Sequence, residues 1–472
     1  MGCAAPERVF EPELTLPESF GVEGWPEDDG RASVPDRWWR VFNDETLNAL
    51  QDRALSANFD LEAVRQRARQ ARAVFRRERS FLFPSLDYNL FAQETRRESN
   101  DFEAENTFGA SAIGTYQADV WAQNRSLARN ARLSAAVAEE RLRAAAIALS
   151  ADVAQTYFAL VEQRGQANIL EQQIRTNEQV LRVVRARFGS GVVRASDVLR
   201  QERLLESTRA QIQGVRANVR VLENALQVLV GRPPTDQTEA SLDTLPETPD
   251  RPPLGLPAEL VRRRPDVRSD MLAIRAADAE LAAAVADQFP NVTLSLDAAT
   301  IEQAIGDLFN DWFAVLGIDV LGPLFDAGRR RAEIRRAEAF KSERAAAYAQ
   351  SVLIALRQVL DAVAQESALE RQIALIKSQL ELAARTSERL NREYLNGDIS
   401  YIDVLDALTT EQRLQRDLLS TRLARLNARI NLYVALAGGW PGLVESEPLA
   451  GQRNAPRPAP EQTIQPGRER DS

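Results

Sequence analysis

The chain has 472 residues, 44% hydrophobic and 27% charged, and 59 arginines and lysines against 68 acidic residues leave a net charge of −9. The length allows two or three ordinary domains or one large extended one, and the acidic balance argues against broad nucleic-acid binding. The absence of histidine excludes a Ser-His-Asp triad, a His-ligated metal and a histidine pH switch, while the single cysteine excludes an intrachain disulfide.

The amino-terminal segment begins with Cys3 after a small residue and continues as a stretch rich in Pro, Glu, Asp and Gly. A cysteine placed there is typical of the end of a bacterial lipobox, where it becomes the first mature residue and carries lipid. An ordinary thiol explains these residues equally well. No basic and apolar signal sequence precedes the cysteine, so we expect any signal peptide to be missing from this sequence. Residues 1–40 are predicted to be an extended segment without its own core.

A helix and two strands are predicted next. The helix covers 59–82 and stops at Phe83-Pro84, because proline cannot continue a helix. Apolar and polar residues then alternate with period two, which predicts strands over 84–96 and 107–121.

A very long helix follows the strands. Residues 125–188 contain no proline, hardly any glycine and many good helix formers, and at ~1.5 Å per residue they predict a helix of about 100 Å. The helix stops at Gly189-Ser190-Gly191, since glycine tolerates the left-handed backbone of a helix end. A second helix over 195–230 is predicted to return beside it.

The second half of the chain repeats the first with a constant offset of 206 residues. Phe83-Pro84 recurs as Phe289-Pro290, and Gly191 with Asp197-Val198-Leu199 recurs as Gly397 with Asp403-Val404-Leu405. Several landmarks with one offset indicate a duplicated unit. The second unit is therefore expected to contain helices over 266–288, 328–395 and 401–436, and strands over 290–300 and 312–322.

These elements define the expected domain organisation. The repeats occupy 41–240 and 259–440, joined by a Pro-rich linker over 241–258 and followed by a disordered tail over 441–472. In each repeat the two shorter helices together are nearly as long as the long one. We therefore expect them to stack end to end beside it, which produces a long cylinder of antiparallel helices.

The strands point to a β-barrel in a membrane. No apolar run approaches the ~18 residues of a membrane helix, but each strand has one apolar side and about the length that crosses a bilayer as a tilted strand. Four strands cannot close a barrel, so the barrel must be shared between subunits. Three subunits would supply twelve strands, although composition alone does not exclude two or four subunits. The alternative is a soluble helical coiled-coil scaffold with incidental hairpins, which would need no apolar strand face.

Several motifs resemble one known family, the TolC-like outer membrane factors, in particular the NodT/OprM-type lipoproteins of multidrug efflux pumps. The resemblance spans about Cys3 to Trp440 and rests on these residues: Trp38-Trp39, Phe42 and Leu47; Asn58-Phe59-Asp60-Leu61; Gly255-Leu256-Pro257 with Leu260; Arg262-Arg263-Arg264-Pro265-Asp266-Val267; Pro323-Leu324-Phe325-Asp326-Ala327-Gly328-Arg329-Arg330; and Leu432-Tyr433 with Ala435-Leu436 before Gly438-Gly439-Trp440. One departure is Ala122-Gln123-Asn124, where the family usually has a Leu-Phe-Gly-like turn.

The resemblance implies a fold and a function. The fold is mostly α with a pair of transmembrane β-hairpins: a long α-helical barrel continuous with a 12-stranded β-barrel shared by three protomers. The implied function is the passive exit duct of a tripartite, RND-type efflux system in the outer membrane, without cofactors. Its implied partners are a periplasmic adaptor and, indirectly, an inner-membrane pump. The resemblance also favours lipidation of Cys3.

A gate is expected where the second long hairpin turns. Asp403 and Asp406 share nearly one helix face, as do Ile402 and Asp406, and in a trimer each position would form a ring of three. Carboxylates in a first helical turn also simply favour the helix dipole, and without the resemblance that interpretation is preferred. By resemblance, the aspartates match charged rings of the channel entrance, and Ile402 with Asp406 match a constriction.

Other tip residues are assigned by the same resemblance. Tyr394 matches a tyrosine that helps to hold the closed state. Asp197, the repeat equivalent of Asp403, is a weaker candidate for adaptor contact or helix capping, and Gly191 and Gly397 are possible tip or adaptor contacts.

Two other functions remain as alternatives. Within the family, the chain could be the exit duct of a type I protein secretion system. Outside it, the soluble scaffold is the rival. An enzyme is the least favoured class. Without histidine, and with the carboxylates dispersed along the chain, no group of residues forms a recognisable catalytic site.

Overall fold

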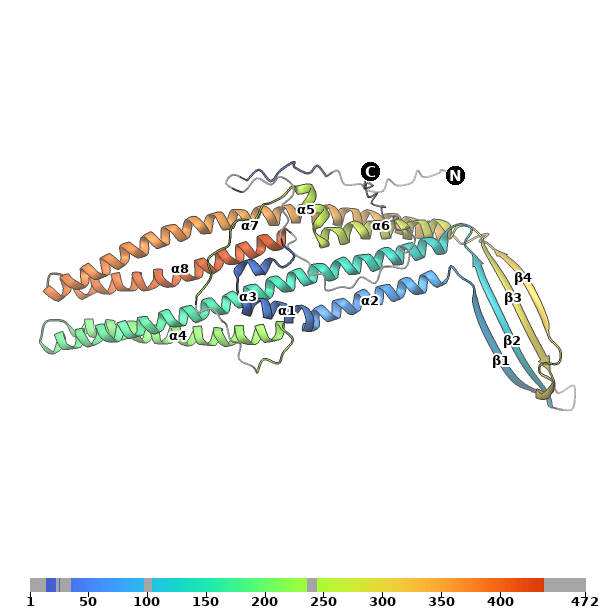
Figure 1. Ribbon diagram of the computed structural model, residues 1–472, viewed down its shortest axis with the longest axis horizontal. Coiled ribbons are helices and arrows are strands. Elements are labelled where there is room, and N and C mark those ends of the chain that lie inside the picture. The colour runs from blue at the N-terminus through green and yellow to red at the C-terminus, as the bar shows by residue number, and fades with distance from the viewer. Residues whose placement is uncertain (1–13, 23–24, 26–34, 97–103, 236–243, 437–472) are drawn as a thin grey trace, which may run out of the picture.

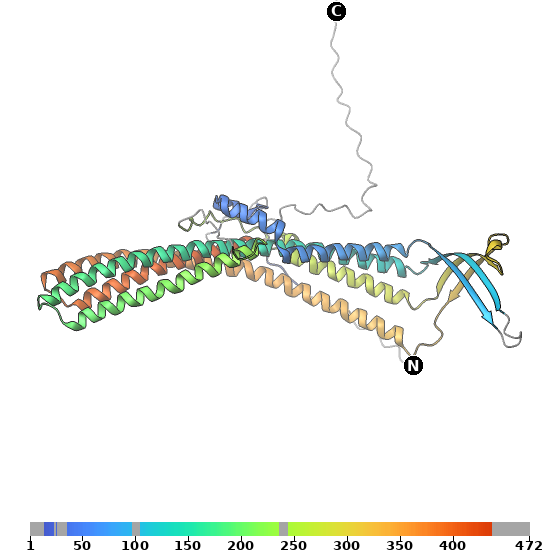
Figure 2. The same ribbon diagram turned by 90° about the horizontal axis from the view of Figure 1, so that it is seen from below.

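The molecule is a long rod of helices with a β-sheet at one end that bends away from the rod (Figure 1). The computed structural model describes residues 14–22, 25, 35–96, 104–235 and 244–436. Cys3 and the predicted tail over 441–472 lie outside the described residues. The far end of the rod, here called the tip, consists of the α3–α4 and α7–α8 turns (Figures 1 and 2).

In the part of the chain that the structure describes, six long helices build the rod, and all six were predicted to within three residues at either end. They are α2 (Phe59–Ser80), α3 (Gln123–Gly189), α4 (Ala195–Leu229), α6 (Pro265–Ala286), α7 (Arg329–Asn396) and α8 (Tyr401–Ala435). With 67 and 68 residues, α3 and α7 are each about 100 Å long.

The shorter helices stack end to end beside the long ones, as predicted. The Asn58 side chain at the start of α2 donates to the carbonyl of Leu229 at the end of α4, at 3.0 Å. In the second repeat, the Arg264 guanidinium before α6 donates to the carbonyl of Ala435 at the end of α8, at 3.2 Å. Each side chain thereby satisfies a helix-end carbonyl that has no partner within its own helix.

Three short elements near the middle of the rod were not predicted. They are η1 (Trp38–Phe42), α1 (Glu45–Ala57) and α5 (Pro257–Arg263), so the last residues of both the expected N-terminal extended segment and the expected linker are helical. Trp38 is fully buried and stacks on Tyr433 with ring centroids 5.6 Å apart. These elements pack with the long helices around the largest buried apolar cluster, here called the equatorial core.

One expectation about apolar runs was wrong. An 18-residue window of α3 is long and apolar enough to cross a membrane by composition alone, and 61% of it is buried inside the fold. The small alanines and aliphatic residues of this stretch, such as Ala154 and Leu160, are covered by the equatorial core. We therefore assign it as a core helix.

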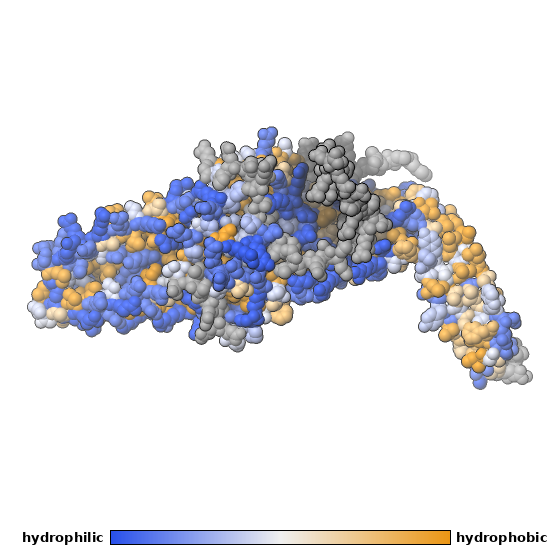
Figure 3. Space-filling view, in the orientation of Figure 1, coloured by the Kyte–Doolittle hydropathy of each residue, from blue (hydrophilic) through white to orange (hydrophobic). Residues whose placement is uncertain are grey.

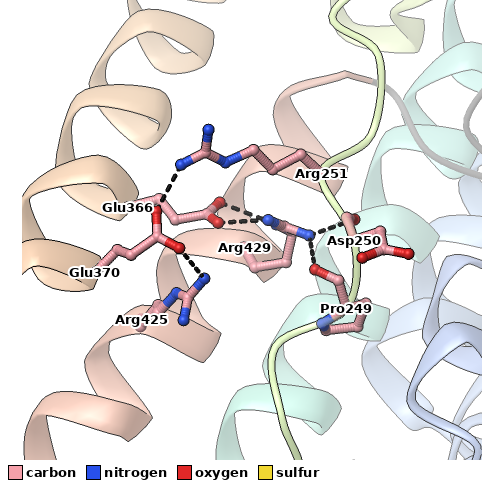
Figure 4. Close-up of polar contacts among 7 residues, drawn as sticks. All are labelled: Pro249, Asp250, Arg251, Glu366, Glu370, Arg425 and Arg429. Carbon is pink, nitrogen blue, oxygen red and sulfur yellow. Dashed lines mark hydrogen bonds and ion pairs between the residues drawn. The ribbon is translucent and has the colours of Figure 1, made fainter. Parts of the chain in front are cut away.

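A buried polar joint fastens the inter-repeat linker to α7 and α8 (Figure 4). Arg429 of α8 and Glu366 of α7 are 0% exposed and form a two-bond ion pair, with one N···O distance of 2.9 Å. The same guanidinium also donates to the linker carbonyls of Pro249 and Asp250. Beside it, Glu370 accepts from Arg251 of the linker and Arg425 of α8.

Among the described residues, the sheet contains four antiparallel strands in the order β1-β2-β3-β4. They are β1 (Ser85–Arg96), β2 (Ala104–Ala118), β3 (Asn291–Glu302) and β4 (Phe313–Leu321). Three strands lie within two residues of the predicted bounds, whereas β2 starts and ends three residues earlier than the predicted 107–121. The chain leaves the sheet at Asp119, whose carboxylate accepts the backbone N–H groups of Asn124 and Arg125 and caps α3.

The strand register places all even-numbered positions on one face of the sheet. Leu86 pairs with Gly114, Gly114 with Leu296, and Leu296 with Leu316. Because the register is even throughout, the apolar sides of the four strands combine into one continuous apolar face. The odd positions form the opposite face.

The two strand-to-helix turns predict a pair of opposite substitution effects. Ala122 precedes α3 with φ 63°, and its repeat equivalent Gly328 precedes α7 with φ 88°. A side chain is strained in this left-handed region. We expect Ala122→Gly to raise the free energy of unfolding by about 1 kcal/mol and Gly328→Ala to lower it by about 1 kcal/mol. Urea unfolding in detergent measures both changes in stability. A loss of stability in Ala122→Gly would show that the left-handed backbone at Ala122 is not strained.

Candidate functional site

The even face of the sheet has the properties of a surface that contacts lipid. Its large apolar side chains are solvent-exposed in the single chain, including Leu86 at 79% and Leu316 at 76%. No other described element covers them, and the space-filling view shows hydrophobic residues along this arm (Figure 3). An exposed apolar patch of this extent marks an interaction surface.

The odd face is largely polar. It carries Asp87, Asn89, Thr115, Ser295 and Asp319, together with scattered apolar residues. A sheet that is apolar on one side and polar on the other suits a barrel wall between lipid and a water-filled lumen.

The outer edges of β1 and β4 have no strand partner among the described residues. Unpaired N–H and C=O groups are costly in a lipid environment, so a sheet with free edges cannot remain alone in a bilayer. The sheet is therefore complete only when further strands pair with both edges.

At the opposite end, both tip turns use glycine to end a long helix. Gly191 has φ 72° and Gly397 has φ 89°. After each glycine, a backbone N–H reaches back into the last helical turn, from Val192 to Arg187 and from Asp398 to Glu393, both at 3.0 Å. Both glycines are exposed, so the turns can contact another molecule.

The three predicted gate residues of α8 point away from the protein interior. Ile402 is 49% exposed, and Asp403 and Asp406 are also exposed. Their neighbours Tyr401 and Val404 are buried instead. The Asp403 carboxylate accepts from the Ser400 hydroxyl at 2.7 Å, as a residue in the first turn of a helix can. The structure thus brings Ile402, Asp403 and Asp406 onto one free face of the tip.

Tyr394, by contrast, is separated from that face and lies inside the protomer. It is 4% exposed and packs against Tyr401, with ring centroids 5.5 Å apart, while the Arg187 guanidinium of α3 covers its ring at 4.7 Å. Burial raises the pKa of both phenols, so they stay neutral at physiological pH. Tyr394 therefore joins α7 to α3 within one protomer.

Asp197 serves as a helix cap. Its carboxylate accepts the backbone N–H of Arg194 at 3.3 Å and pairs with Arg200 at 3.1 Å, within the first turn of α4. Of its two predicted roles, capping is the one that these contacts support.

Sequence reasoning missed a group of buried polar side chains on α3, α4 and α8. Gln173, Asn177, Gln201 and Gln412 are each at most 5% exposed and are hydrogen-bonded to one another or to backbone carbonyls. The sequence did contain a sign of them: these amides occupy positions where the helical spacing predicts buried apolar residues. Only their burial distinguishes them from the many exposed amides of these helices.

A family model described as "Outer membrane efflux protein" matches residues 50–232 and 256–438. Among curated proteins, the chain is 31% identical to the pyoverdine export outer membrane protein OpmQ of Pseudomonas aeruginosa, over 87% of this chain and 89% of OpmQ. It is 27% identical to the probable outer membrane lipoprotein SilC of Salmonella typhimurium, over 93% of this chain and 96% of SilC.

The cation efflux system protein CusC of Escherichia coli is similar in both sequence and structure. It is 29% identical over 93% of this chain and 96% of CusC. A solved structure of CusC overlays with a TM-score of 0.79 at 26% identity, covering 91% of this chain and 99% of that chain. The match therefore includes the helical rod as well as the sheet.

Proposed function

Because the chain belongs to the outer membrane efflux protein family, we propose that three copies form one exit duct of a tripartite efflux system. Each protomer contributes four strands to a twelve-stranded barrel in the outer membrane. Its helices form one third of an α-helical barrel that extends into the periplasm. Small molecules pass through this duct without a chemical step.

One observation carries this proposal: a sheet with a continuous apolar face and two free edges is joined directly to helices about 100 Å long. The apolar face requires lipid, and the free edges require further strands. The long helices supply a wall that reaches far from the membrane. A soluble scaffold has no use for the first two features.

The tip turns around Gly191 and Gly397 are the proposed contacts for a periplasmic adaptor protein. Both glycines are exposed at the end of the rod farthest from the sheet. An inner-membrane RND-type pump would connect through that adaptor. The relatives support an efflux role, because OpmQ is named for export and CusC for cation efflux.

Detergent-solubilised protein tests the assembly. Light scattering, after the detergent is subtracted, should give three times the protomer mass of 52.5 kDa. Membrane-bound protein should resist a carbonate wash and need detergent for release. A folded monomer that washes off with carbonate would overturn the proposal and favour the soluble scaffold.

We propose that Ile402, Asp403 and Asp406 form the narrow entrance of the duct. Carboxylates that face one another across a narrow pore attract cations and exclude anions. Asp403→Ala with Asp406→Ala should therefore lower the cation-to-anion permeability ratio several-fold in planar-bilayer recordings, while the trimer persists. Asp398→Ala with Asp417→Ala, which removes two carboxylates elsewhere on the same hairpin, is the matched control. Equal selectivity in wild type and the gate variant would contradict this assignment.

Cys3 is the proposed lipid anchor of the duct. The proposal is supported by the position of the cysteine after a small residue and by the name of SilC, an outer membrane lipoprotein. When expressed behind a functional signal sequence, the wild type should incorporate labelled palmitate and Cys3→Ser should not. Equal labelling of the two proteins would contradict lipidation at Cys3.

A further inference from the structure

Four arginines on one side of the rod, close to the sheet, have no partner within the described part of the chain. They are Arg129 and Arg132 of α3 and Arg331 and Arg335 of α7, here called the arginine collar. All four are exposed, and among the described residues none of their guanidinium groups forms an ion pair, a hydrogen bond or a ring contact. The collar is therefore free to bind a group from outside the protomer.

Neighbouring arginines at the same end of the rod are paired within the chain. Arg125 pairs with Asp119 at 2.9 Å, and Arg336 pairs with Glu280 at 2.6 Å. The collar arginines of α3 lie where acidic side chains are lacking, because residues 123–138 contain none although the whole chain has a net charge of −9. Positive charge is thus concentrated at the sheet end of an acidic protein.

A cavity on the opposite side of the same helices shows which way the collar points. The cavity has a volume of about 270 Å³, lies between α3, α6 and α7, and has a lining that includes Ala138, Arg141, Phe340 and Arg344. Each of these four residues follows a collar arginine by nine positions. Nine residues are two and a half turns of an α-helix, so the two members of each pair lie on opposite faces. The collar therefore points away from the cavity on both helices.

Contacts further along α3 identify the collar side as the outer side of the rod. Arg132 precedes Ser150 by eighteen residues, which is five full turns, so both lie on one stripe of the helix. The Ser150 carbonyl accepts from the Gln51 amide of α1 at 2.7 Å, and the Ser150 hydroxyl accepts from the Trp38 indole of η1 at 3.3 Å. Figure 2 shows α1, in dark blue, on one side of the rod. Elements on the lumen side would obstruct the proposed duct, so α1 marks the outside and the cavity faces the lumen.

The collar also lies at the level where a bilayer around the sheet would end. The helices α3 and α7 begin five and eight residues after the ends of β2 and β4. At ~1.5 Å per residue, the collar extends from about 3 Å to about 14 Å along the two helices. Lipid headgroups add about 5–8 Å beyond the hydrocarbon core, and long arginine side chains can reach toward that layer. Trp121, 46% exposed between β2 and α3, is a residue typical of this boundary.

Phosphate is the chemical group that this arrangement fits. A guanidinium group binds phosphate oxygens through two parallel hydrogen bonds and keeps its charge at physiological pH. Within each helix, the two collar arginines are three or four positions apart and therefore lie side by side. Clusters of basic residues beside a membrane-spanning segment attract anionic lipid headgroups. Three copies of the chain would place three such collars around the proposed barrel.

We propose that the arginine collar binds the phosphates of anionic phospholipids in the periplasmic leaflet of the outer membrane. This inference rests on the proposed duct function, because it assumes that the sheet crosses that membrane and that the cavity side faces the lumen. The bound headgroups then fix the depth of the barrel in the bilayer and hold the rod in the periplasm.

Lipid enrichment on the purified trimer tests the proposal. The trimer is incubated in mixed micelles with equal amounts of dioleoylphosphatidylglycerol, which is anionic, and dioleoylphosphatidylcholine, which is zwitterionic, and the co-purifying lipid is quantified. We expect the anionic lipid to be enriched at least threefold in the wild type. Replacing all four collar arginines with glutamine should bring the ratio back to about one. A wild type without enrichment, or a collar variant that keeps it, would overturn the proposal.

A charge-matched control separates the collar from the overall charge of the trimer. Four other exposed cations lie on the same two helices but at least 40 residues from the start of each: Arg175, Arg182, Arg371 and Lys377. Replacing these four with glutamine removes the same charge, about 60 Å or more from the sheet end. The enrichment should stay at the wild-type value. An equal loss in this control would show that net charge alone attracts the lipid, and the collar assignment would fall.

Two further measurements keep the test decisive. If the fourfold variant does not assemble, Arg129→Gln with Arg132→Gln and Arg331→Gln with Arg335→Gln are tested separately, and each pair should lose part of the enrichment. No loss in either pair would count against the collar. In lipid-free detergent, labelled inorganic phosphate should be retained equally by the wild type and these variants. Retention that depends on the collar would assign it to the free ion instead of a lipid.

Conductance separates a failure of this inference from a failure of the duct. Because the collar faces away from the lumen, the fourfold variant should keep the wild-type cation-to-anion permeability ratio in planar bilayers. A changed ratio would place the arginines in the lumen and overturn the proposal. Lipid enrichment needs no transport, so a wild-type trimer that conducts nothing would overturn the proposed duct and leave the lipid comparison as a separate result.

Discussion

Arginine in place of Leu296 is expected to prevent stable assembly in the membrane. Leu296 lies in the middle of β3, on the apolar face of the sheet, and is 51% exposed in the single chain. A charged side chain on the lipid face of a barrel strand near the bilayer midplane costs about 2–4 kcal/mol. In a trimer the same substitution is made three times. The fraction of protein recovered as carbonate-resistant trimer should fall severalfold or more.

The neighbouring residue supplies the control for this experiment. Ser295 lies on the polar face, where it pairs with Thr115 and Gly317 of the adjacent strands. Ser295→Arg therefore adds the same side chain at almost the same depth, but toward the proposed lumen, and the yield of trimer should be preserved. Equal assembly of both variants would leave the lipid face unassigned. Failure of Ser295→Arg alone would show that the odd face, and not the even face, contacts lipid.

Removal of the arginine from the buried joint is expected to destabilise the helical rod strongly. Arg429→Met leaves Glu366, which is 0% exposed, without its guanidinium partner, and it also removes the donor to two linker carbonyls. Breaking a buried ion pair by removing one partner typically costs about 3–5 kcal/mol. The urea midpoint of helix unfolding in detergent should fall accordingly.

Two further variants identify the cause of that loss. Arg425 pairs with the partly exposed Glu370 at 2.9 Å, so Arg425→Met should cost no more than about 1 kcal/mol. Glu366→Leu combined with Arg429→Met removes the unpaired charge and should recover part of the stability that Arg429→Met loses. A double variant that recovers none of the stability would show that the unpaired charge of Glu366 does not cause the loss, which would then be assigned to the two linker carbonyls that lose their donor.

Local residue patterns were sufficient for the long elements. The boundaries of α3 and α7 followed from long runs of helix-forming residues that end at Gly191 and Gly397, and a positive φ at both glycines agrees with that reasoning. The constant offset between the repeats then predicted where each element of the first half recurs in the second half. The position of β2 was predicted three residues too late, because alternation alone could not show that Asp119 leaves the strand to cap α3.

The candidate site was predictable only in part. The spacing of Ile402, Asp403 and Asp406 placed them near one helix face, and the structure leaves all three exposed there. Tyr394 belongs to the same stretch of sequence, yet it is buried against Arg187 of the distant helix α3. Sequence spacing could not provide that distinction, because the face that α7 turns inward depends on how α3 packs against it.

By itself, then, the sequence determined the six long helices of the rod, the approximate positions of the strands and which strand positions are apolar, since these depend on residues within a few positions of one another. The tertiary structure decided the long-range pairings: the even register that joins four apolar strand sides into one face, and the burial of Glu366 with Arg429. It also decided which amides became the contact between the two hairpins. These features depend on the free energy of groups that are far apart in the chain and become neighbours only when the helices and strands pack together.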